Sequence, residues 1–364
     1  MIFLRCDRTS TERKQRRTFV NQTPAGNSVA IKADYLQIYQ ICISSRDAVA
    51  SQRWYTDGIG MRRSRLADLD SDVKPPSARL TPDSEIGLSE IQGIPGPVEI
   101  KKRACCVDKQ GFFQMELFQY GTPEARPRRA DWRPSDIGYS LLSIHVDDFD
   151  STLARLATMG TTPLGPVVGE RGERRVCVLD PDSVVVEIME DDPRTPESIV
   201  RAHPEFGAAV RSVRLSVPDL ERSHRFFVDT LGMKPSRSDL LHCVEHEALW
   251  GLAGADRQIE LVSAGDMWVE LVHYTDPVGR PRPDDFRISD QGLLNIGLGS
   301  RNIKDYERTR DAVVGAGYHV EIEGVIEFLT CLYVLDDQGF SVEITYISEG
   351  ADEEFGLVPE PAGP

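Results

Sequence analysis

The strongest constraint on the fold is an internal repeat, because the second half of the chain echoes the first. Residues 115–139 align without a gap on residues 269–293, and the identical residues include Glu116 with Glu270. Self-similarity at a fixed offset is the signature of a duplicated structural unit. We therefore expect the second half of the chain to adopt the same architecture as the first.

Each half consists of two smaller units of one kind. A unit opens with a short alternating strand, passes through an Asp or Asn into an amphipathic helix, and closes with further strands. The expected helix caps are Asp47, Asp148, Asp219 and Asn302, and the glycines expected to end the helices are Gly60, Gly160, Gly232 and Gly317. The pattern predicts an α+β fold of four β-α-β-β-β modules.

Two segments of this pattern resemble a known family. SVPDLERSHRFFVDTLGM at residues 216–233 looks like the family's first strand and helix, and LDPDSVVVEIME at residues 179–190 looks like its last turn and strand. The chain thus resembles the vicinal oxygen chelate superfamily, which includes glyoxalase I, bleomycin-resistance proteins and extradiol dioxygenases. The resemblance implies that modules pair into cups, and that a divalent metal in a cup holds two neighbouring substrate oxygens.

The resemblance and the local charge divide the chain into five regions. We expect a basic flexible arm, an N-terminal domain of two modules, a linker, a C-terminal domain of two modules and an acidic tail. Their boundaries are 1–33, 34–192, 193–206, 207–348 and 349–364. A longer loop around residues 68–88 accounts for the extra length of the first half.

Composition narrows the classes of partner. The chain of 364 residues has 42 Lys and Arg against 58 Asp and Glu, a formal net charge of −16, which disfavours nucleic acid and anionic membrane surfaces. No apolar run is long enough to span a bilayer. The seven cysteines form no C-x-x-C pair, so we interpret them as reduced thiols of a cytoplasmic protein.

The family resemblance also implies where metal ligands would lie. One ligand comes from the opening strand, seven residues before the helix cap, and a second is the glutamate of the last strand. The opening-strand positions hold Gln40, Leu141, Ser212 and Asn295, and the last-strand positions hold Glu116, Glu187, Glu270 and Glu343. The two-histidine iron site of a ring-cleaving dioxygenase needs histidines that these positions lack.

The N-terminal half matches a glyoxalase I cup better. We expect Gln40, Glu116 and Glu187 to hold a divalent metal (Fe, Zn, Mn or Ni), unless the protein binds none, with Glu116 also acting in catalysis. His145 lies on the inward face of its strand, and we interpret it as a proton carrier at the entrance or as a histidine bonded to the backbone. The alternative metal cup consists of Asn295, Glu270 and Glu343.

Salt bridges offer a competing role for the glutamates. Arg214 shares the inward face with Ser212 and could pair with Glu270, which would fill that cup with a cation instead of a metal. Ser143, Arg214, Ser212 and Trp268 are the expected substrate-binding residues.

Two further motifs have alternative interpretations. Residues 242–246 spell H-x-x-E-H, which can bind zinc on a helix, but we interpret the match as chance. The duplicated segment R-P-R-x-x-D-[WF]-R-x-S-D offers arginines for an anionic substrate or forms a strut between modules. We favour the strut.

The function expected from the resemblance is an enzyme of glyoxalase, lyase or isomerase type that acts on a small oxygenated substrate. A relative of the extradiol ring-cleaving dioxygenases and a metal-free resistance protein that sequesters small molecules are the alternatives. The expected partner is a small-molecule substrate, without nucleic acid or membrane, and the chain is expected to act as a monomer or homodimer.

Overall fold

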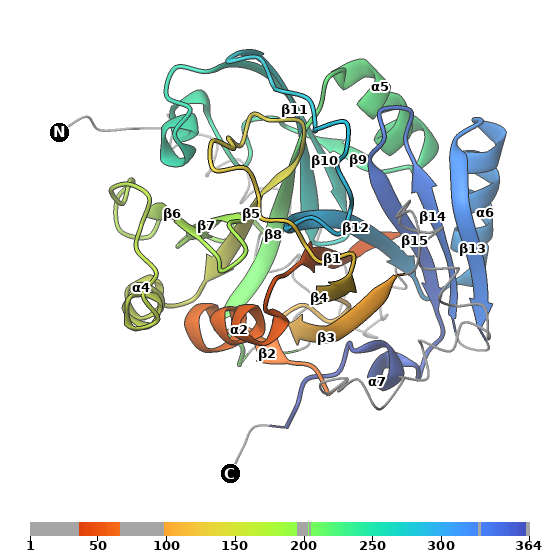
Figure 1. The fold of residues 1–364 in the computed structure, drawn as a ribbon, viewed down its shortest axis with the longest axis horizontal. Coiled ribbons are helices and arrows are strands. Elements are labelled where there is room, and N and C mark those ends of the chain that lie inside the picture. The colour runs from red at the N-terminus through yellow and green to blue at the C-terminus, as the bar shows by residue number, and fades with distance from the viewer. Residues whose placement is uncertain (1–35, 66–97, 195–202, 204, 327–328, 362–364) are drawn as a thin grey trace, which may run out of the picture.

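The structure, a computed structural model, describes residues 36–65, 98–194, 203, 205–326 and 329–361. The expected basic arm, most of the expected linker and the expected long loop therefore lie outside the described residues. Four modules with the expected strand–helix–strand order follow one another along the described chain (Figure 1). This arrangement confirms the α+β fold that the repeat predicts.

The first two modules occupy residues 37–189. The elements of the first are β1 (Gln37–Ser44), α2 (Ala48–Arg53) with a π-helical continuation (Trp54–Ile59), β2 (Arg62–Arg63), β3 (Glu99–Val107) and β4 (Gln114–Thr122). Those of the second are β5 (Gly138–Val146), α4 (Phe149–Thr158), β6 (Arg175–Leu179) and β7 (Val185–Met189). An isolated bridge between Val168 and Arg175 stands where the second module would carry its remaining strand.

The third and fourth modules occupy residues 208–347. The elements of the third are β8 (Ala208–Ser216), α5 (Leu220–His224) with a π-helical continuation (Arg225–Thr230), β9 (Lys234–Ser236), a short helix (Val244–Trp250), β10 (Asp256–Ala264) and β11 (Met267–Asp276). Those of the fourth are β12 (Gly292–Ser300), α6 (Ile303–Gly315), β13 (His319–Ile326), β14 (Leu329–Leu335) and β15 (Ser341–Ile347). A last helix, α7 (Asp352–Phe355), follows.

The helix caps lie where the sequence places them. The side chains of Asp47, Asp148, Asp219 and Asn302 each accept a hydrogen bond from a backbone N–H of the first helical turn. Beyond each helix a glycine adopts a positive φ, for example 104° at Gly60. The caps and glycines fix both ends of each helix and thereby the return of the chain to its sheet.

The modules pair across the halves of the chain instead of within them. One sheet has the order β13-β14-β15-β12-β1-β4-β3-β2 and joins the first module to the fourth, and the other has the order β6-β7-β5-β8-β11-β10-β9 and joins the second to the third. The expected cups within residues 34–192 and 207–348 are therefore wrong. The repeat specifies each module but contains no information on its partner, since all four modules present equivalent opening strands.

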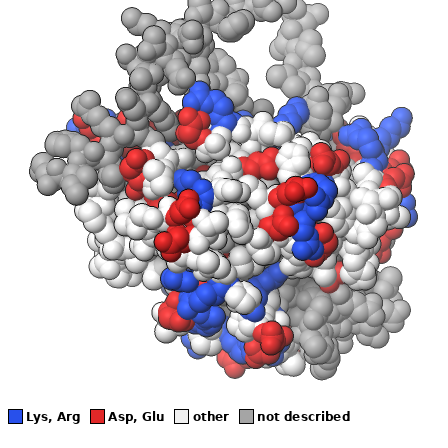
Figure 2. All heavy atoms as spheres, turned by 90° about the horizontal axis from the view of Figure 1, so that it is seen from above, with Lys and Arg blue, Asp and Glu red and all other residues white. Residues whose placement is uncertain are grey.

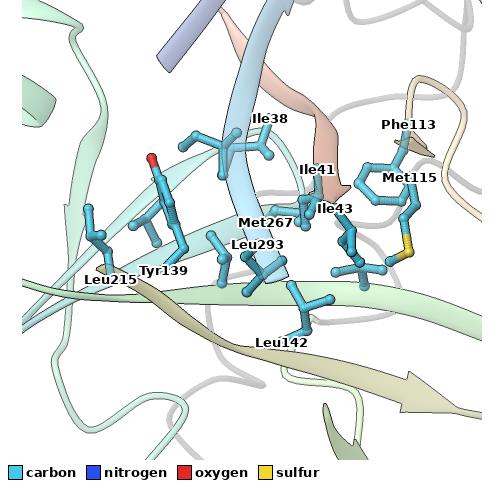
Figure 3. Packing of buried hydrophobic residues seen from close by; sticks show 14 of the residues in the cluster. Ile38, Ile41, Ile43, Phe113, Met115, Tyr139, Leu142, Leu215, Met267 and Leu293 are labelled. Carbon is cyan, nitrogen blue, oxygen red and sulfur yellow. The ribbon is translucent and has the colours of Figure 1, made fainter. Parts of the chain in front are cut away.

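One hydrophobic core lies between the two sheets and the helices. It includes Ile41 of β1, Met115 of β4, Leu142 of β5, Leu215 of β8 and Met267 of β11 (Figure 3). Because neighbouring residues of a strand point to opposite faces, the residues beside these, such as those at positions 40, 116 and 214, lie on the other face of their sheet.

The duplicated arginine-rich segment joins the two halves reciprocally. The Arg126 guanidinium donates to both oxygens of Asp290, at 2.7 and 2.6 Å, and Arg280 donates to both oxygens of Asp136, each at 2.7 Å. Bidentate pairs of this kind fix geometry as well as charge. The contacts support the interpretation of the segment as a strut.

The C-terminal segment, which we expected as an acidic tail, packs on the first module as far as the structure describes it. Phe355 and Leu357 are buried in a cluster with Tyr39 and Phe112, and the Phe355 ring lies 5.7 Å from the Tyr39 ring. The backbone N–H of Arg65 donates to Val358 at 2.7 Å. Apolar packing and backbone hydrogen bonds together hold this segment on the first module.

The surface charges and the helices can be compared with the partners that the composition disfavours. On the face shown in Figure 2, acidic and basic side chains of the described residues lie in small mixed groups. No helix among the described residues is long and apolar enough to cross a membrane.

The cysteines agree only in part with the expected reduced thiols. The buried free thiols are Cys42, Cys105, Cys106, Cys177 and Cys331. The interpretation fails at Cys243, which is disulfide-bonded.

Candidate functional site

The sheet pairing gathers the expected metal positions into two clusters of new composition. We call Gln40, Glu116, Asn295 and Glu343 the first–fourth cluster, and Leu141, Glu187, Ser212 and Glu270 the second–third cluster. Each cluster thus takes one half of its residues from each of the two expected cups. The expected set of Gln40, Glu116 and Glu187 is divided between two sheets, because its modules do not pair, and so is the alternative set of Asn295, Glu270 and Glu343.

In the second–third cluster an imidazole lies between the two glutamates. His242 Nε2 lies 2.5 Å from Glu187 Oε2, and His242 Nδ1 contacts Glu270 Oε1. All three side chains are buried. Since both ring nitrogens face a carboxylate, the imidazole is held as the doubly protonated cation.

Two arginines complete the charge balance of this cluster. Arg214 Nε donates to Glu270 Oε2 at 2.8 Å, and Arg175 Nη1 donates to Glu187 Oε1 at 3.1 Å. Burial alone would raise the pKa of Glu270, but the charges of His242 and Arg214 outweigh it and lower that pKa to about 2. The expected pairing of Arg214 with Glu270 is confirmed, and cations of the protein occupy the place between the glutamates.

A further buried carboxylate, Glu247, extends this network. It accepts hydrogen bonds from Arg214 at 3.0 Å, from the Tyr274 hydroxyl at 2.7 Å and from the Trp250 indole at 2.8 Å. Sequence reasoning missed both Glu247 and His242. The available signal was the H-x-x-E-H motif, in which His242 is a bridging cation and not a zinc ligand.

The first–fourth cluster contains a different set of partners. Arg103 Nε and Gln40 Nε2 donate to the Glu116 carboxylate, and the Cys42 thiol lies 3.4 Å from it. The β1 and β4 strands run parallel and place Cys42 beside Glu116. Sequence reasoning also missed Arg103. The available signal was a basic residue followed directly by apolar residues of the same strand.

Several oxygen atoms of the first–fourth cluster have no hydrogen-bond partner among the described residues. They are Asn295 Oδ1, Gln114 Oε1 and Glu343 Oε2, all buried. The other oxygen of Glu343 accepts from the Thr345 hydroxyl at 3.2 Å. A buried polar atom without a partner is costly, so these atoms indicate a site that a ligand, a metal or a proton completes.

The protonation of Glu343 is tuned to neutral pH. Burial and the nearby charge of Glu116 raise the pKa of Glu343 to about 7, and they outweigh the hydroxyls of Tyr333, Thr345 and Tyr39 beside the carboxyl, which lower it. A carboxyl group with such a pKa can both accept and release a proton at physiological pH.

The chemistry of the donor atoms decides which cluster fits a divalent metal. The first–fourth cluster offers two carboxylates and the amide oxygens of Gln40 and Asn295, with Gln114 beside them, and oxygen donors suit hard cations such as Mg²⁺ or Mn²⁺. Among the described residues no three His, Cys, Asp or Glu side chains lie together as a metal site, so amide oxygens would have to complete the donor set. The second–third cluster does not fit a cation, because cations of the protein pair with both of its glutamates, whereas in the first–fourth cluster Arg103 pairs with Glu116 alone.

His145 lies apart from the first–fourth cluster. It is on β5, in the second–third sheet, and its Nε2 lies 3.3 Å from Asp147. Burial lowers the pKa of His145, so its imidazole is neutral at pH 7. The structure does not bring His145 to Gln40 and Glu116, because β5 pairs with β7 and β8 instead of with the first module.

The expected substrate-binding residues all lie in the second–third sheet. Ser143 donates to Glu187 at 3.0 Å, and the Ser212 hydroxyl is buried without a hydrogen-bond partner among the described residues. The Trp268 ring stacks under the Arg194 guanidinium, at 3.8 Å, and its indole donates to Ser236 at 3.3 Å. Together with Arg214 they belong to a filled region, so the structure gives them packing and charge-pairing contacts.

Known proteins share this fold and part of the sequence. Residues 37–188 match the family described as the Glyoxalase/Bleomycin resistance protein/Dioxygenase superfamily. Glyoxalase I from Zea mays is similar in structure, with a TM-score of 0.55 and 17% identity over 85% of this chain and 92% of its own. A "putative dioxygenase" from Bacillus subtilis subsp. subtilis str. 168 has a TM-score of 0.53 and 12% identity over 90% of each chain. No curated protein matches the chain in sequence.

Proposed function

Because this chain is a member of the Glyoxalase/Bleomycin resistance protein/Dioxygenase superfamily, matched over residues 37–188, we propose that it is an enzyme of lyase or isomerase type. Its substrate is a small oxygenated molecule, and its active site is the first–fourth cluster. The observation that carries this proposal is the row of buried oxygens without partners around Glu343. A purely structural cluster would pair its carboxylate oxygens, as the second–third cluster pairs both oxygens of Glu187 and of Glu270.

The residues of the first–fourth cluster have separate roles in the proposed reaction. Gln40, Glu116, Asn295 and Glu343 would hold a divalent cation, which supplies Lewis-acid polarisation of a substrate oxygen when bound. When it is not bound to the cation, Glu343 can also take up or release a proton, since burial and the charge of Glu116 raise its pKa in the metal-free protein to about 7. Arg103 forms an ion pair with Glu116 and balances its charge.

Dioxygenase chemistry receives no support from the ligand types. Ring-cleaving iron sites use two histidines and a carboxylate. The corresponding positions here hold Gln40 and Asn295, and the imidazole of His242 is held between two glutamates of the other sheet.

Metal binding tests the proposal directly. We expect chelator-treated protein to bind one Mn²⁺ per chain in an electron paramagnetic resonance titration, and Glu343→Gln to weaken that binding by about 10-fold or more. Glu187→Gln is the matched control, because Glu187 is the repeat counterpart of Glu343 and lies in the second–third cluster, and it should leave Mn²⁺ affinity unchanged. Loss of Mn²⁺ binding in Glu187→Gln with full binding in Glu343→Gln would show that the metal site lies in the other sheet.

A further inference from the structure

A cavity of about 200 Å³ lies at the end of the first–fourth sheet. Its walls come from the starts of β5 and β12, from β13, from the turn between β14 and β15, and from the strut segment. The described lining residues include Arg282, Arg287, Leu294, Glu321, Phe340 and Ser341. The lining combines apolar side chains such as Leu294 and Phe340 with polar ones, two of them arginines, which suits a small organic anion with an apolar part.

The cavity adjoins the first–fourth cluster through β15. Ser341, which lines the cavity, and Glu343 lie two residues apart on the same face of that strand, roughly 7 Å along it. The Ser341 hydroxyl is buried without a hydrogen-bond partner among the described residues, as is Glu343 Oε2. The unpartnered oxygens thus continue from the cluster to the wall of the cavity.

Arg282 presents a positive charge to this cavity. Its guanidinium donates to the backbone carbonyl of Gly339 at 2.7 Å and lies over the rings of Phe286 and Phe340, at 5.1 and 4.9 Å. Within the described part of the chain it forms no ion pair, in contrast to Arg126 and Arg280 of the same strut. Burial lowers the pKa of Arg282, and the nearby charge of Asp336 compensates this effect only in part. A partly buried guanidinium without an ion pair favours an anion beside it.

Arg287 supplies a second donor. Its Nε is buried without a hydrogen-bond partner among the described residues, and the carboxylate of Asp290, 3.9 Å away, is held by Arg126. Glu321 is the acid among the described lining residues, and burial raises its pKa to about 7. Its carboxyl group therefore opposes an anion less than an ordinary glutamate would.

We infer that this cavity binds the carboxylate end of an apolar or aromatic carboxylate, with Arg282 and Arg287 as its anchors. The size agrees, since an apolar cavity of roughly 150 Å³ accommodates a benzene ring and this one measures about 200 Å³. As far as it names the substrate class, the inference rests on the proposed function, because the other end of the ligand would face Glu343.

The other half of the molecule provides a matched control. Arg128 is the repeat counterpart of Arg282, and it also donates to a backbone carbonyl, that of Ser183 at 3.2 Å, and stacks on an aromatic ring, that of Trp132 at 3.9 Å. Trp132 packs against a cluster that contains Trp250 and Leu252. A second cavity of about 290 Å³ lies beside Arg128 and is also lined by Arg282, together with Asp136, Asp285 and Asp290, whose carboxylates disfavour an anion there. Arg128 lines only this second cavity, so a substitution of Arg128 distinguishes a ligand bound there from one bound beside Arg287.

Isothermal titration calorimetry with benzoate tests the inference on the full chain. We expect benzoate to bind the unaltered protein and its neutral analogue benzamide to bind at least about 10-fold more weakly. Arg282→Met should weaken benzoate binding by about 10-fold or more, and Arg128→Met should change it by less than about 2-fold. Arg287→Gln, expected to weaken binding by about 3-fold, provides a second test if Arg282→Met does not fold.

Three results would overturn the inference: no benzoate binding at millimolar concentration, equal binding of benzoate and benzamide, or equal losses in Arg282→Met and Arg128→Met. None of them bears on Mn²⁺ binding, which tests the proposed function. Retained Mn²⁺ binding without a benzoate site would reject only the carboxylate pocket, and the opposite result would reject only the metal-assisted enzyme.

Discussion

The two clusters occupy equivalent places in the duplicated fold, but they accommodate their buried glutamates in different ways. Both bury two glutamates from last strands. The second–third cluster neutralises them with Arg214 and His242, whereas the repeat counterpart of Arg214 in the first–fourth cluster is Cys42. Burial raises the pKa of the Cys42 thiol well above its usual value, so Cys42 supplies no charge.

This difference separates a cluster that serves stability from one that serves chemistry. A complete set of ion pairs leaves no coordination position open, and breaking it is costly. Buried oxygens without partners reduce stability, and proteins retain such groups where a ligand or a reaction uses them. Substitutions at equivalent positions should therefore have opposite consequences in the two clusters.

The largest expected effect is that of Arg214→Met. It leaves Glu270 and Glu247 without their buried cation, and loss of one partner of such a pair costs about 3–5 kcal/mol of unfolding free energy. Cys42→Ala, the equivalent position of the other cluster, should cost about 1 kcal/mol or less. Urea unfolding measures both, and equal losses would remove the distinction between the clusters.

Acidification should unfold the protein through the second–third cluster. The pKa of Glu270 falls to about 2 in the folded protein, so its contribution to stability is present above pH 4.5 and is lost as the pH falls toward 2. For this one group the loss amounts to about 3 kcal/mol. His242 acts in the opposite direction: its raised pKa contributes stability below pH 6.5, which is lost at high pH.

Urea titrations at pH 6 and pH 3 measure this dependence. In His242→Gln, which removes the bridging cation, the unfolding free energy should be lower at pH 6 and should depend less on pH. A variant that keeps the full dependence would show that other carboxylates cause the acid unfolding.

Glu343→Gln should stabilise the metal-free protein at alkaline pH. The folded protein binds a proton at Glu343 up to about pH 7 and the unfolded chain only up to about pH 4.5, so ionisation of Glu343 costs stability as the pH rises between these values. We expect a gain of about 1–3 kcal/mol at pH 8 and little change at pH 4, measured in the presence of a chelator. A loss of stability at pH 8 would mean that Glu343 has a cationic partner.

The smallest expected effects are those of alanine substitutions at two buried serines. Ser143→Ala removes the hydrogen bond to Glu187 and should cost about 1 kcal/mol. Ser212→Ala removes a hydroxyl without a partner among the described residues and should be neutral or slightly stabilising. Thermal unfolding distinguishes the two, and a larger loss in Ser212→Ala would indicate that its hydroxyl binds an ordered ligand.

The features that local chemistry determines could be predicted from the sequence. The helix caps such as Asp219, the glycine at position 60 and the four last-strand glutamates follow from spacing within one module, and the structure places them as expected. The ion pair of Arg214 with Glu270 was predictable because both lie on one face of neighbouring strands.

The features that depend on long-range pairing could not be predicted. The first module could pair with the second or with the fourth, and the packing of the opening strands decides between them. The opening strands of all four modules have similar edges, so the sequence does not reveal the partner. The counterpart of the His242 segment in the first module contains no histidine, so the repeat gave no support for a histidine between Glu187 and Glu270. The composition of both clusters therefore required the three-dimensional structure.

The second and third modules, which pair with each other, lie between the first and the fourth in the sequence. This arrangement determines the order in which the two sheets can form. Residues 142 and 213 pair within the second–third sheet, whereas residues 41 and 296 pair within the first–fourth sheet, so the latter waits for a far longer stretch of chain. During synthesis, the two middle modules leave the ribosome together and can close their charge-balanced sheet early, because contacts near in sequence form faster. The first module must remain without its partner until nearly the whole chain has been translated, which makes its open strand edge the part of the nascent protein most in need of a chaperone.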